Sequence, residues 1–362
     1  MAIAAPPPEP PPLAPVGERS MTVTIKDVAR LAQVSVATVS RVLNASAPVR
    51  DDTRARVLEV ARELRFAPNG AARTLSRRQA SALGVILPDL YGEFFSELLR
   101  GIDLEAQRAG HALLVSSSHH DAHGVSVAVR AMRGRVDGLL VMAPEVSSAS
   151  LATALPEGLP AVILNAPPTP GSTAAVTVDN MGGTRAVVQH LAKLGHREIA
   201  FICGPPHNAD AAARLRGFRA AMRTAGCPVR DAFVMSGDFT EEGGWRAARN
   251  LVARAGVQPT AIFAANDAMA VGVLLALHEA DVDVPGEVSV IGFDDIPIAR
   301  YVTPALTTVR VAIDVLGARA AALLFRALAD PVMRGDAHRE VIPAELVVRH
   351  SCGPPPVPAR RR

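Results

Sequence analysis

The sequence has no apolar run that approaches the roughly 18 residues of a membrane-spanning helix. Its N-terminus also lacks the basic start and apolar middle of a signal peptide, so we expect a cytoplasmic protein with no membrane partner. The three cysteines, Cys203, Cys227 and Cys352, are scattered without C-x-x-C spacing. This pattern argues against a disulfide framework and a zinc site, and we expect no metal.

Catalytic motifs are absent as well. The chain has no G-x-S-x-G nucleophile turn, no G-x-x-x-x-G-K-[ST] phosphate loop and no G-x-G-x-x-G dinucleotide fingerprint. Asp294 and Asp295 are adjacent, but neighbours at a strand end point in different directions and suit an acid–base pair poorly. The histidines between His119 and His123 could ligate a metal, although a solvated loop explains them better. We therefore expect neither an enzyme nor a cofactor.

The net charge of +3 is unevenly distributed. Residues 21–80 contain 11 Lys and Arg against 5 Asp and Glu, whereas the rest of the chain contains 27 against 30. Clustered positive charge at one end is expected for contacts with nucleic acid phosphates, although a solvated face is an equally simple explanation. A chain of 362 residues with 49% hydrophobic content is long enough for two or three domains.

Proline-rich segments close both ends of the chain, in residues 1–21 and 351–362. Repeated proline removes backbone donors and favours an extended chain, so we expect flexible tails there. The C-terminal tail contains no leucine heptad, which favours a dimer over a coiled-coil assembly of higher order.

Residues 22–68 have the pattern of a helix-turn-helix DNA-binding domain. Thr24 and Asp27 have the spacing of a helix start, and Val28, Leu31 and Ala32 supply an apolar stripe, which predicts a helix over residues 25–32. After a short break, Ser35 caps a second helix with Val39, Val42 and Leu43 facing inward. A third helix is predicted over residues 52–66, with Val57, Ala61 and Leu64 on one face.

In such a domain the first residues of the second helix meet base edges in the major groove. Val36 and Ala37 would contact thymine methyl groups, and Arg41 would reach guanine. The alternative is that Val36 and Ala37 belong to the core of the domain.

Residues 69–79 are predicted to form a hinge. Asn69 can cap a helix of about two turns, which is too short to be stable in isolation. Surrounded by arginines, this helix would fold in the minor groove and insert Leu75 between base pairs. The alternative is a flexible linker, and both states can occur at different times.

From residue 80 onward, short apolar runs alternate with helical stretches, which indicates parallel sheets covered on both faces. Ten such runs are too many for one open sheet, so we expect two α/β lobes with a ligand crevice at the carboxyl ends of the strands. The predicted strands are Ala82–Pro88, His111–Ser117, Asp137–Ala143, Ala161–Asn165, Ala175–Val178, Glu198–Gly204, Ala232–Gly237, Thr260–Ala265, Val288–Gly292 and Leu306–Arg310.

Several motifs then resemble, in order, those of the lactose-repressor (LacI/GalR-type) family. They include T-I-K-D-V-A-R-L-A-Q-V-S-V-A-T-V-S-R-V-L-N, P-N-G-A-A-R-T-L-S, V-D-G-L-L-V, L-G-H-R-E-I-A-F-I, R-L-R-G-F, V-P-G-E-V-S-V-I-G-F-D-D and P-A-L-T-T-V-R, and they span residues 22–351. The resemblance implies a homodimeric repressor of transcription on double-stranded, palindromic operator DNA. It also implies an effector-binding core, residues 80–350, similar to a periplasmic sugar-binding protein.

The resemblance further implies discontinuous lobes. The first would comprise residues 80–194 and 311–338 and the second residues 195–310 and 339–350, with chain crossings near Gly195, Arg310 and residue 338. The DNA-binding residues that it implies are Thr24, Ser35, Val36, Ala37, Thr38, Ser40, Arg41, Asn44, Asn69, Ala72, Arg73 and Leu75.

The predicted effector residues are Phe94, Phe95, Asp210, Arg214, Phe239, Asn266, Asp267 and Asp294. Of these, Phe94, Phe95, Arg214, Phe239 and Asp294 match effector positions of the family. Arg214 would clamp the effector with its fork of donors, although a surface arginine is the alternative. Phe239 would stack on the ligand, and Phe94 and Phe95 would lie at the mouth of the first lobe; the alternative for all three is core packing. Asn266 and Asp267 end a strand and would bind sugar or cap a helix. Asp295 is expected to be structural.

Asn208 and Asp210 stand where purine-responsive members have arginine and threonine, which speaks against a nucleobase. The polar set suits vicinal hydroxyl groups, so we predict a sugar effector of the galactose type. A nucleobase- or nucleoside-responsive regulator is the alternative, and a sugar-binding protein without a regulatory role is a more distant one.

Overall fold

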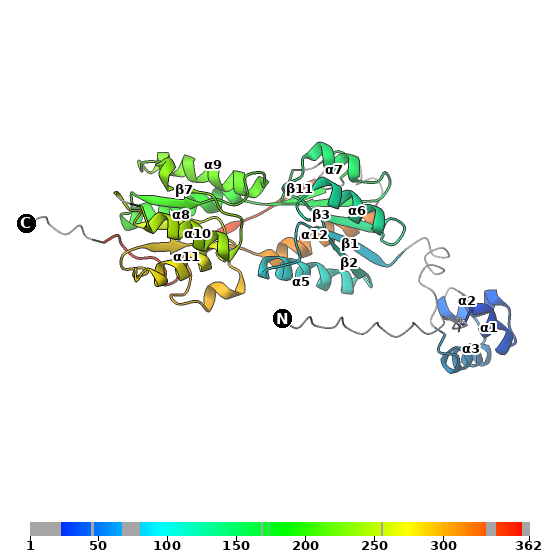
Figure 1. The fold of residues 1–362 in the computed structure, drawn as a ribbon. Coiled ribbons are helices and arrows are strands. Elements are labelled where there is room, and N and C mark those ends of the chain that lie inside the picture. The colour runs from blue at the N-terminus through cyan, green and yellow to red at the C-terminus, as the bar shows by residue number, and fades with distance from the viewer. Residues whose placement is uncertain are drawn as a thin grey trace, which may run out of the picture. The chain divides into compact units, whose positions relative to one another are not determined.

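The computed structural model describes residues 23–44, 47–66, 80–167, 169–172, 174–254, 256–330 and 338–356. The chain divides into two compact units, Met1–Arg77 and Arg78–Arg362, whose elements are labelled in Figure 1. No helix in these described ranges is long and apolar enough to cross a membrane.

The described residues of the first unit, 23–44 and 47–66, form the three predicted helices: α1 (Ile25–Leu31), α2 (Val36–Asn44) and α3 (Asp51–Glu63). Val28, Ala32, Val39 and Val57 are fully buried where the helices meet. The prediction that Leu31 belongs to the buried stripe of α1 is wrong, because Leu31 is 49% exposed. The inward face of α1 is formed by Val28, Ala29 and Ala32 instead. Helix α3 also ends earlier than predicted, since the chain turns away at Arg65, where φ is +48°.

The first lobe of the second unit is built on a six-stranded parallel sheet with the order β11-β5-β4-β3-β1-β2. Side chains alternate along β1: Leu83 and Val85 pack on the α5 and α12 side, and Ala82 and Ile86 pack on the α6 and α7 side. The elements are β1 (Ala82–Leu87), α5 (Glu93–Arg108), β2 (Ala112–Ser117), α6 (Ala122–Met132), β3 (Gly138–Met142), α7 (Ser148–Ala154), β4 (Ala161–Leu164), β5 (Ala174–Val178), α12 (Ile313–Ala329) and β11 (His338–Ile342).

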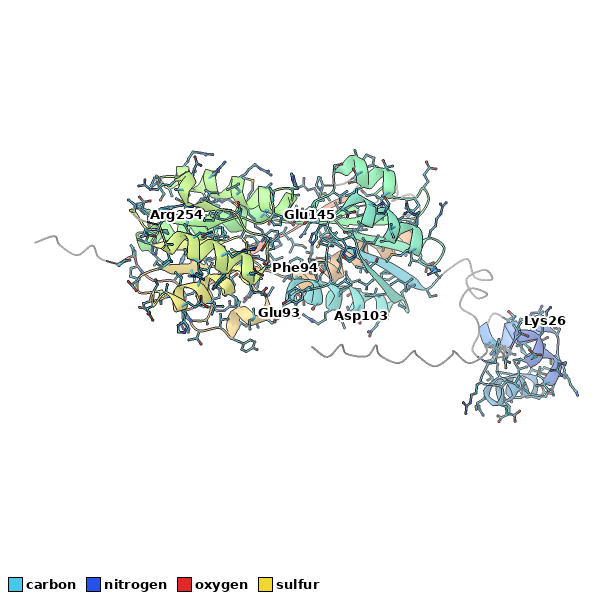
Figure 2. All side chains as sticks on the ribbon, viewed as in Figure 1. Lys26, Glu93, Phe94, Asp103, Glu145 and Arg254 are labelled. Carbon is cyan, nitrogen blue, oxygen red and sulfur yellow. The ribbon has the colours of Figure 1, made fainter. Side chains whose placement is uncertain are left out.

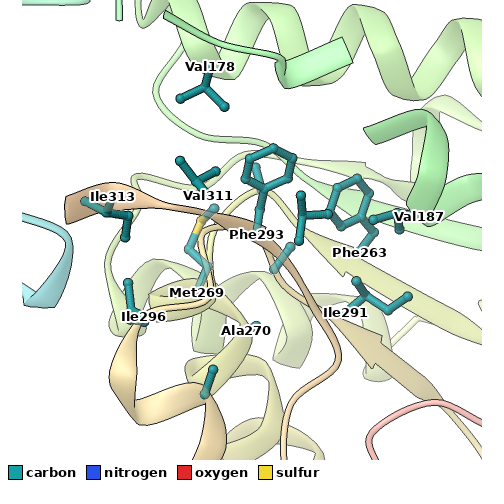
Figure 3. Close-up of a cluster of buried hydrophobic side chains, with 14 of the residues drawn as sticks. Val178, Val187, Phe263, Met269, Ala270, Ile291, Phe293, Ile296, Val311 and Ile313 are labelled. Carbon is teal, nitrogen blue, oxygen red and sulfur yellow. The ribbon is translucent and has the colours of Figure 1, made fainter. Parts of the chain in front are cut away.

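The second lobe has a four-stranded parallel sheet, β7-β6-β8-β9, and a separate antiparallel pair, β10 with β12. Figure 3 shows part of its core, where Phe263, Phe293 and Met269 pack together. The elements are α8 (Asn180–Leu194), β6 (Ile199–Ile202), α9 (Ala209–Thr224), η1 (Asp231–Phe233), β7 (Val234–Met235), α10 (Glu241–Val252), β8 (Ala261–Ala264), α11 (Asp267–Glu279), β9 (Ser289–Ile291), η2 (Pro297–Arg300), β10 (Thr308–Val311) and β12 (Ala344–Val347).

All ten predicted strands are present, and the expected α/β fold with two lobes is confirmed. Two of the expected chain crossings need correction. Helix α8 packs on α9 and β12, so the first lobe ends near Asp179 instead of Gly195. Strand β11 pairs with β5 of the first lobe, so the last crossing lies near Pro343 instead of residue 338. The middle crossing lies between β10 and α12, next to Arg310.

Candidate functional site

The first turn of α2 presents small apolar side chains to solvent. Ser35 begins this turn, and its Oγ accepts a hydrogen bond from the Thr38 amide at 3.1 Å. Val36 is 42% exposed, and Ala37 and Arg41 are exposed as well. This exposure excludes the alternative that Val36 and Ala37 are core residues. The side chains of Val36, Ala37 and Arg41 are therefore accessible to a ligand as large as a DNA duplex.

The remaining predicted DNA-binding residues fall into two groups. Thr24 precedes α1, and both its amide and its Oγ1 hydrogen-bond the Asp27 carboxylate, at 3.0 and 2.7 Å. Thr38 and Ser40 are half-buried on α2, and Asn44 is its last residue. The predicted hinge residues lie outside the described part of the chain: Asn69, Ala72, Arg73 and Leu75.

A cavity of about 560 Å³ opens between the two lobes of the second unit. Phe94 and Glu145 from the first lobe lie where the lobes meet (Figure 2). Seven of the eight predicted effector residues line this cavity: Phe94, Phe95, Asp210, Arg214, Phe239, Asn266 and Asp294.

Arg214 forms the floor of the cavity on α9, and its side chain is only 5% exposed. Its Nε donates to Asn180 Oδ1 at 2.8 Å, and its Nη2 donates to Asp294 Oδ1 at 3.2 Å. Its Nη1 donates to the Ala265 carbonyl oxygen. The surface-arginine alternative is therefore excluded, since a guanidinium held at all three nitrogens is fixed in place.

Two buried carboxylates flank this guanidinium. Burial raises the pKa of Asp294 to about 6, against the opposing effect of Arg214. Burial also raises the pKa of Asp210, whose Oδ1 accepts a hydrogen bond from Asn180 Nδ2 at 2.7 Å. Sequence reasoning missed Asn180, which bridges Asp210 and Arg214 from the first turn of α8.

The first lobe adds polar residues that were not predicted. Glu145 Oε1 accepts a hydrogen bond from Asn208 Nδ2 of the second lobe at 2.7 Å and lies 3.4 Å from His120 Nδ1. Asn165, directly after β4, lies close enough to Asp210 to oppose the rise in the pKa of that carboxyl. Both Glu145 and Asn165 follow the carboxyl ends of parallel strands, so the general position of ligands in such sheets was the signal that could have found them.

Three aromatic rings supply apolar surface. Phe94 and Phe95 meet edge to face with their centroids 5.5 Å apart, and both line the first-lobe side of the cavity. Phe239 lines the opposite side, and its ring centroid lies 6.0 Å from Arg214 Cζ. All three rings are partly exposed, so they present apolar surface to the cavity.

Asp267 is the predicted effector residue that the structure does not place at the cavity. Its side chain is fully buried, with Oδ2 accepting from the Ile296 amide at 2.9 Å and Oδ1 from Thr308 Oγ1 at 2.5 Å. Its neighbour Asn266 lines the cavity and also caps α11, because its Oδ1 accepts from the Met269 amide at 3.0 Å. We therefore remove Asp267 from the site and keep Asn266.

Asp295 has a structural position, as expected. Its carboxylate is 1% exposed and accepts hydrogen bonds from Arg310 Nε at 2.7 Å and Arg349 Nη2 at 2.5 Å. Among the described residues, no group of three or more His, Cys, Asp or Glu is arranged to hold a metal ion.

Comparisons with known proteins match the two units to separate family models. Residues 24–69 match the model of bacterial regulatory proteins of the lacI family, and residues 188–352 match a periplasmic binding protein-like domain. The ribose operon repressor of Escherichia coli (strain K12) is 36% identical over 314 residues, which cover 86% of this chain and 94% of that protein.

Two solved structures are similar over most of their length. The lac repressor dimer bound to operator and the anti-inducer ONPF has a TM-score of 0.81 and 28% identity, over 91% of this chain and 98% of that one. A LacI family transcriptional regulator from Enterococcus faecium with bound ribose has a TM-score of 0.68 and 28% identity, over 75% of this chain and 99% of that one.

Proposed function

Since the chain belongs to the lacI family of bacterial regulatory proteins and is a DNA-binding transcriptional repressor, we propose that a carbohydrate effector in the cavity between its lobes controls it. It would act in the cytoplasm as a homodimer on a palindromic operator, and not as an enzyme. Support for the dimer comes from the lac repressor, which binds its operator as one.

One observation carries the carbohydrate proposal: Arg214, Asp210, Asp294 and Asn266 converge on the floor of one cavity beside Phe239. Together, these groups offer the acceptors and donors that vicinal hydroxyl groups bind, and the ring offers an apolar platform for the sugar's C–H face. The ribose operon repressor and the ribose-bound regulator make ribose a candidate beside the galactose type predicted from the sequence.

The effector would control DNA binding by changing the orientation of the two lobes. Direct hydrogen bonds already join them, from the Ala209 amide to the Pro144 carbonyl at 3.0 Å and from the Ile298 amide to Glu93 Oε2 at 2.8 Å. A ligand that contacts both lobes binds best in one lobe orientation, and its binding therefore shifts the population toward that orientation. The change would reach DNA through the hinge, where the role of Leu75 in the minor groove stays a prediction.

The test is to sequence genomic fragments that the purified protein retains at moderate salt, and then to titrate D-ribose and D-galactose against the selected operator. We expect one palindromic motif, whose binding one of the sugars changes. The variant Arg41→Ala, which lacks the side chain predicted to contact guanine, is the control for sequence-specific DNA binding. Fragments without a shared motif that are released uniformly as salt rises would contradict operator recognition, because only phosphate contacts behave in that way.

A further inference from the structure

The lining of the cavity is markedly acidic. Among the described residues that line it, seven are Asp or Glu, whereas only Arg214 and His120 are basic. Three of these carboxylates lie close to one another. Besides burial, which is the larger cause, the charge of Glu145 raises the pKa of Asp210, and the charge of Asp210 raises the pKa of Asp294. An anionic ligand would add a further negative charge to this group.

The charge of the one guanidinium of the cavity is already balanced within the protein. Each nitrogen of Arg214 donates to a protein acceptor, on Asn180, Ala265 or Asp294. These three bonds use three of the five N–H groups of Arg214, so two remain for ligand hydroxyl groups. The positive charge is balanced by Asp294, at 3.2 Å, so Arg214 offers an anionic ligand little net attraction.

On the first-lobe side, two buried acceptor atoms lack hydrogen bonds. The Glu145 side chain is 9% exposed and its Oε1 is occupied by Asn208, but its Oε2 accepts no hydrogen bond from any described residue. The same holds for Asn165 Oδ1, in a residue that is 5% exposed. Both residues line the cavity. Buried acceptors of this kind are normally satisfied, so these two atoms need a donor that the described residues do not supply.

We propose that Glu145 and Asn165 are effector-contacting residues, and that they restrict the cavity to polyhydroxylated ligands without an anionic group. This inference rests on the carbohydrate proposal and deepens it. Hydroxyl or ammonium groups donate to Glu145 Oε2 and Asn165 Oδ1, so neutral sugars and amino sugars fit. A sugar phosphate or sugar acid brings acceptors and negative charge to a place that needs donors and is already negative.

Calorimetric titration of the full chain tests this inference with pairs of ligands that differ in charge. D-galactose is compared with D-galacturonate, which keeps the ring and replaces the CH₂OH group by a carboxylate. D-ribose is compared with D-ribose 5-phosphate. For whichever sugar binds, we expect its anionic partner to bind on the order of a hundredfold more weakly or not at all.

The variant Glu145→Gln keeps the shape of the side chain and removes its charge. We expect it to weaken binding of the neutral sugar. The difference in affinity between the neutral sugar and its anionic partner should become about tenfold smaller. Glu157→Gln is the matched control, because Glu157 is an exposed carboxylate of the same lobe that does not line the cavity. It should leave both affinities unchanged. If the difference in affinity between neutral and anionic ligand were the same in both variants, Glu145 would not be an effector-contacting residue.

The remaining outcomes separate the two proposals. An anionic partner that binds the wild-type protein as tightly as its neutral sugar overturns the charge restriction and leaves carbohydrate control in place. Failure of all four ligands, with the protein folded and bound to its operator, contradicts carbohydrate control itself, and the restriction falls with it. The wild-type comparison needs no variant and so does not depend on whether Glu145→Gln folds.

Discussion

The guanidinium of Arg214 lies over the ring of Phe293, with Cζ 3.7 Å from the ring centroid. Phe293 is fully buried in the core of the second lobe and directly precedes Asp294, the ion-pair partner of Arg214. One short segment therefore stacks on the guanidinium and pairs with it. The polar floor of the cavity and the hydrophobic core share these contacts, so changes at the floor affect both effector binding and stability.

Arg214→Ala is expected to abolish the response to effector and to lower the free energy of unfolding by about 3–5 kcal/mol. Removing one partner of a buried pair leaves Asp294 as an uncompensated charge, which accounts for the loss of stability. Thermal unfolding and calorimetric titration measure the two effects. Arg216→Ala, an exposed position on the same helix, is the control and should behave like the wild type. Unchanged effector affinity in Arg214→Ala would show that the cavity is not the effector site.

The raised pKa of Asp294 predicts a pH dependence of stability. Burial lifts this pKa from 3.8 to about 6 in the folded protein. The folded state therefore binds the proton more tightly than the unfolded state, and the resulting stabilisation is complete below pH 4 and is lost as the pH rises through 6. A shift of this size corresponds to about 3 kcal/mol.

Denaturant unfolding between pH 4.5 and 7.5 measures this contribution. In Asp294→Asn the part that comes from Asp294 should disappear, so stability should fall less steeply with rising pH. Asp231→Asn removes a carboxylate whose side chain is 95% exposed and is expected to retain the wild-type slope. Equal slopes in all three proteins would show that Asp294 has an ordinary pKa.

The neighbours Asn266 and Asp267 are expected to respond differently to substitution by alanine. Asp267→Ala leaves the Ile296 amide and Thr308 Oγ1 without their buried acceptor, which should cost about 2–5 kcal/mol of stability. Asn266→Ala removes a helix cap worth about 1 kcal/mol and a group that lines the cavity, so it should weaken effector binding more than it weakens the fold. Thermal unfolding together with effector titration of both variants tests this, and a larger loss of affinity in Asp267→Ala would reverse the assignment.

The fold could be predicted well from the sequence, because this fold depends on local patterns. Continuous apolar runs such as residues 82–87 mark strands buried on both faces, and the ends of these strands lead to Asn266 and Asp294. Strand β11 was missed because it is an edge strand with exposed residues and lacks such a run.

The errors concern packing between distant segments. Asn266 and Asp267 are adjacent and chemically similar, and Asp267 is enclosed because Thr308 and Ile296, distant in the sequence, bind its carboxylate. Helix α8 has an amphipathic pattern that suits either lobe, and its contacts with α9 and β12 determine where it belongs. Glu145 stands alone in a loop, so its role depends on Asn208 and His120, which follow different strands. Sequence periodicity contains none of this information.

Because the first turn of α2 is exposed, we expect substitutions there to change the recognition of DNA bases without changing the stability of the protein. Arg41→Ala should leave the melting temperature unchanged because Arg41 is exposed. A side chain that reads guanine is worth about 1–3 kcal/mol, so affinity for the selected operator should fall about tenfold to a hundredfold, with preference relaxed at one base pair. Val36→Ala should reduce operator affinity by a smaller factor, whereas Leu58→Ala, 43% exposed on α3, serves as the control for losing an exposed apolar side chain.

Fluorescence anisotropy with the operator and with single-base variants of it measures these effects. If Arg41→Ala weakened binding equally on every duplex and reduced the salt slope by about one, Arg41 would contact phosphate and not a base. Loss of preference at one position with an unchanged salt slope would instead establish that α2 reads sequence, because phosphate contacts are the same at every base pair.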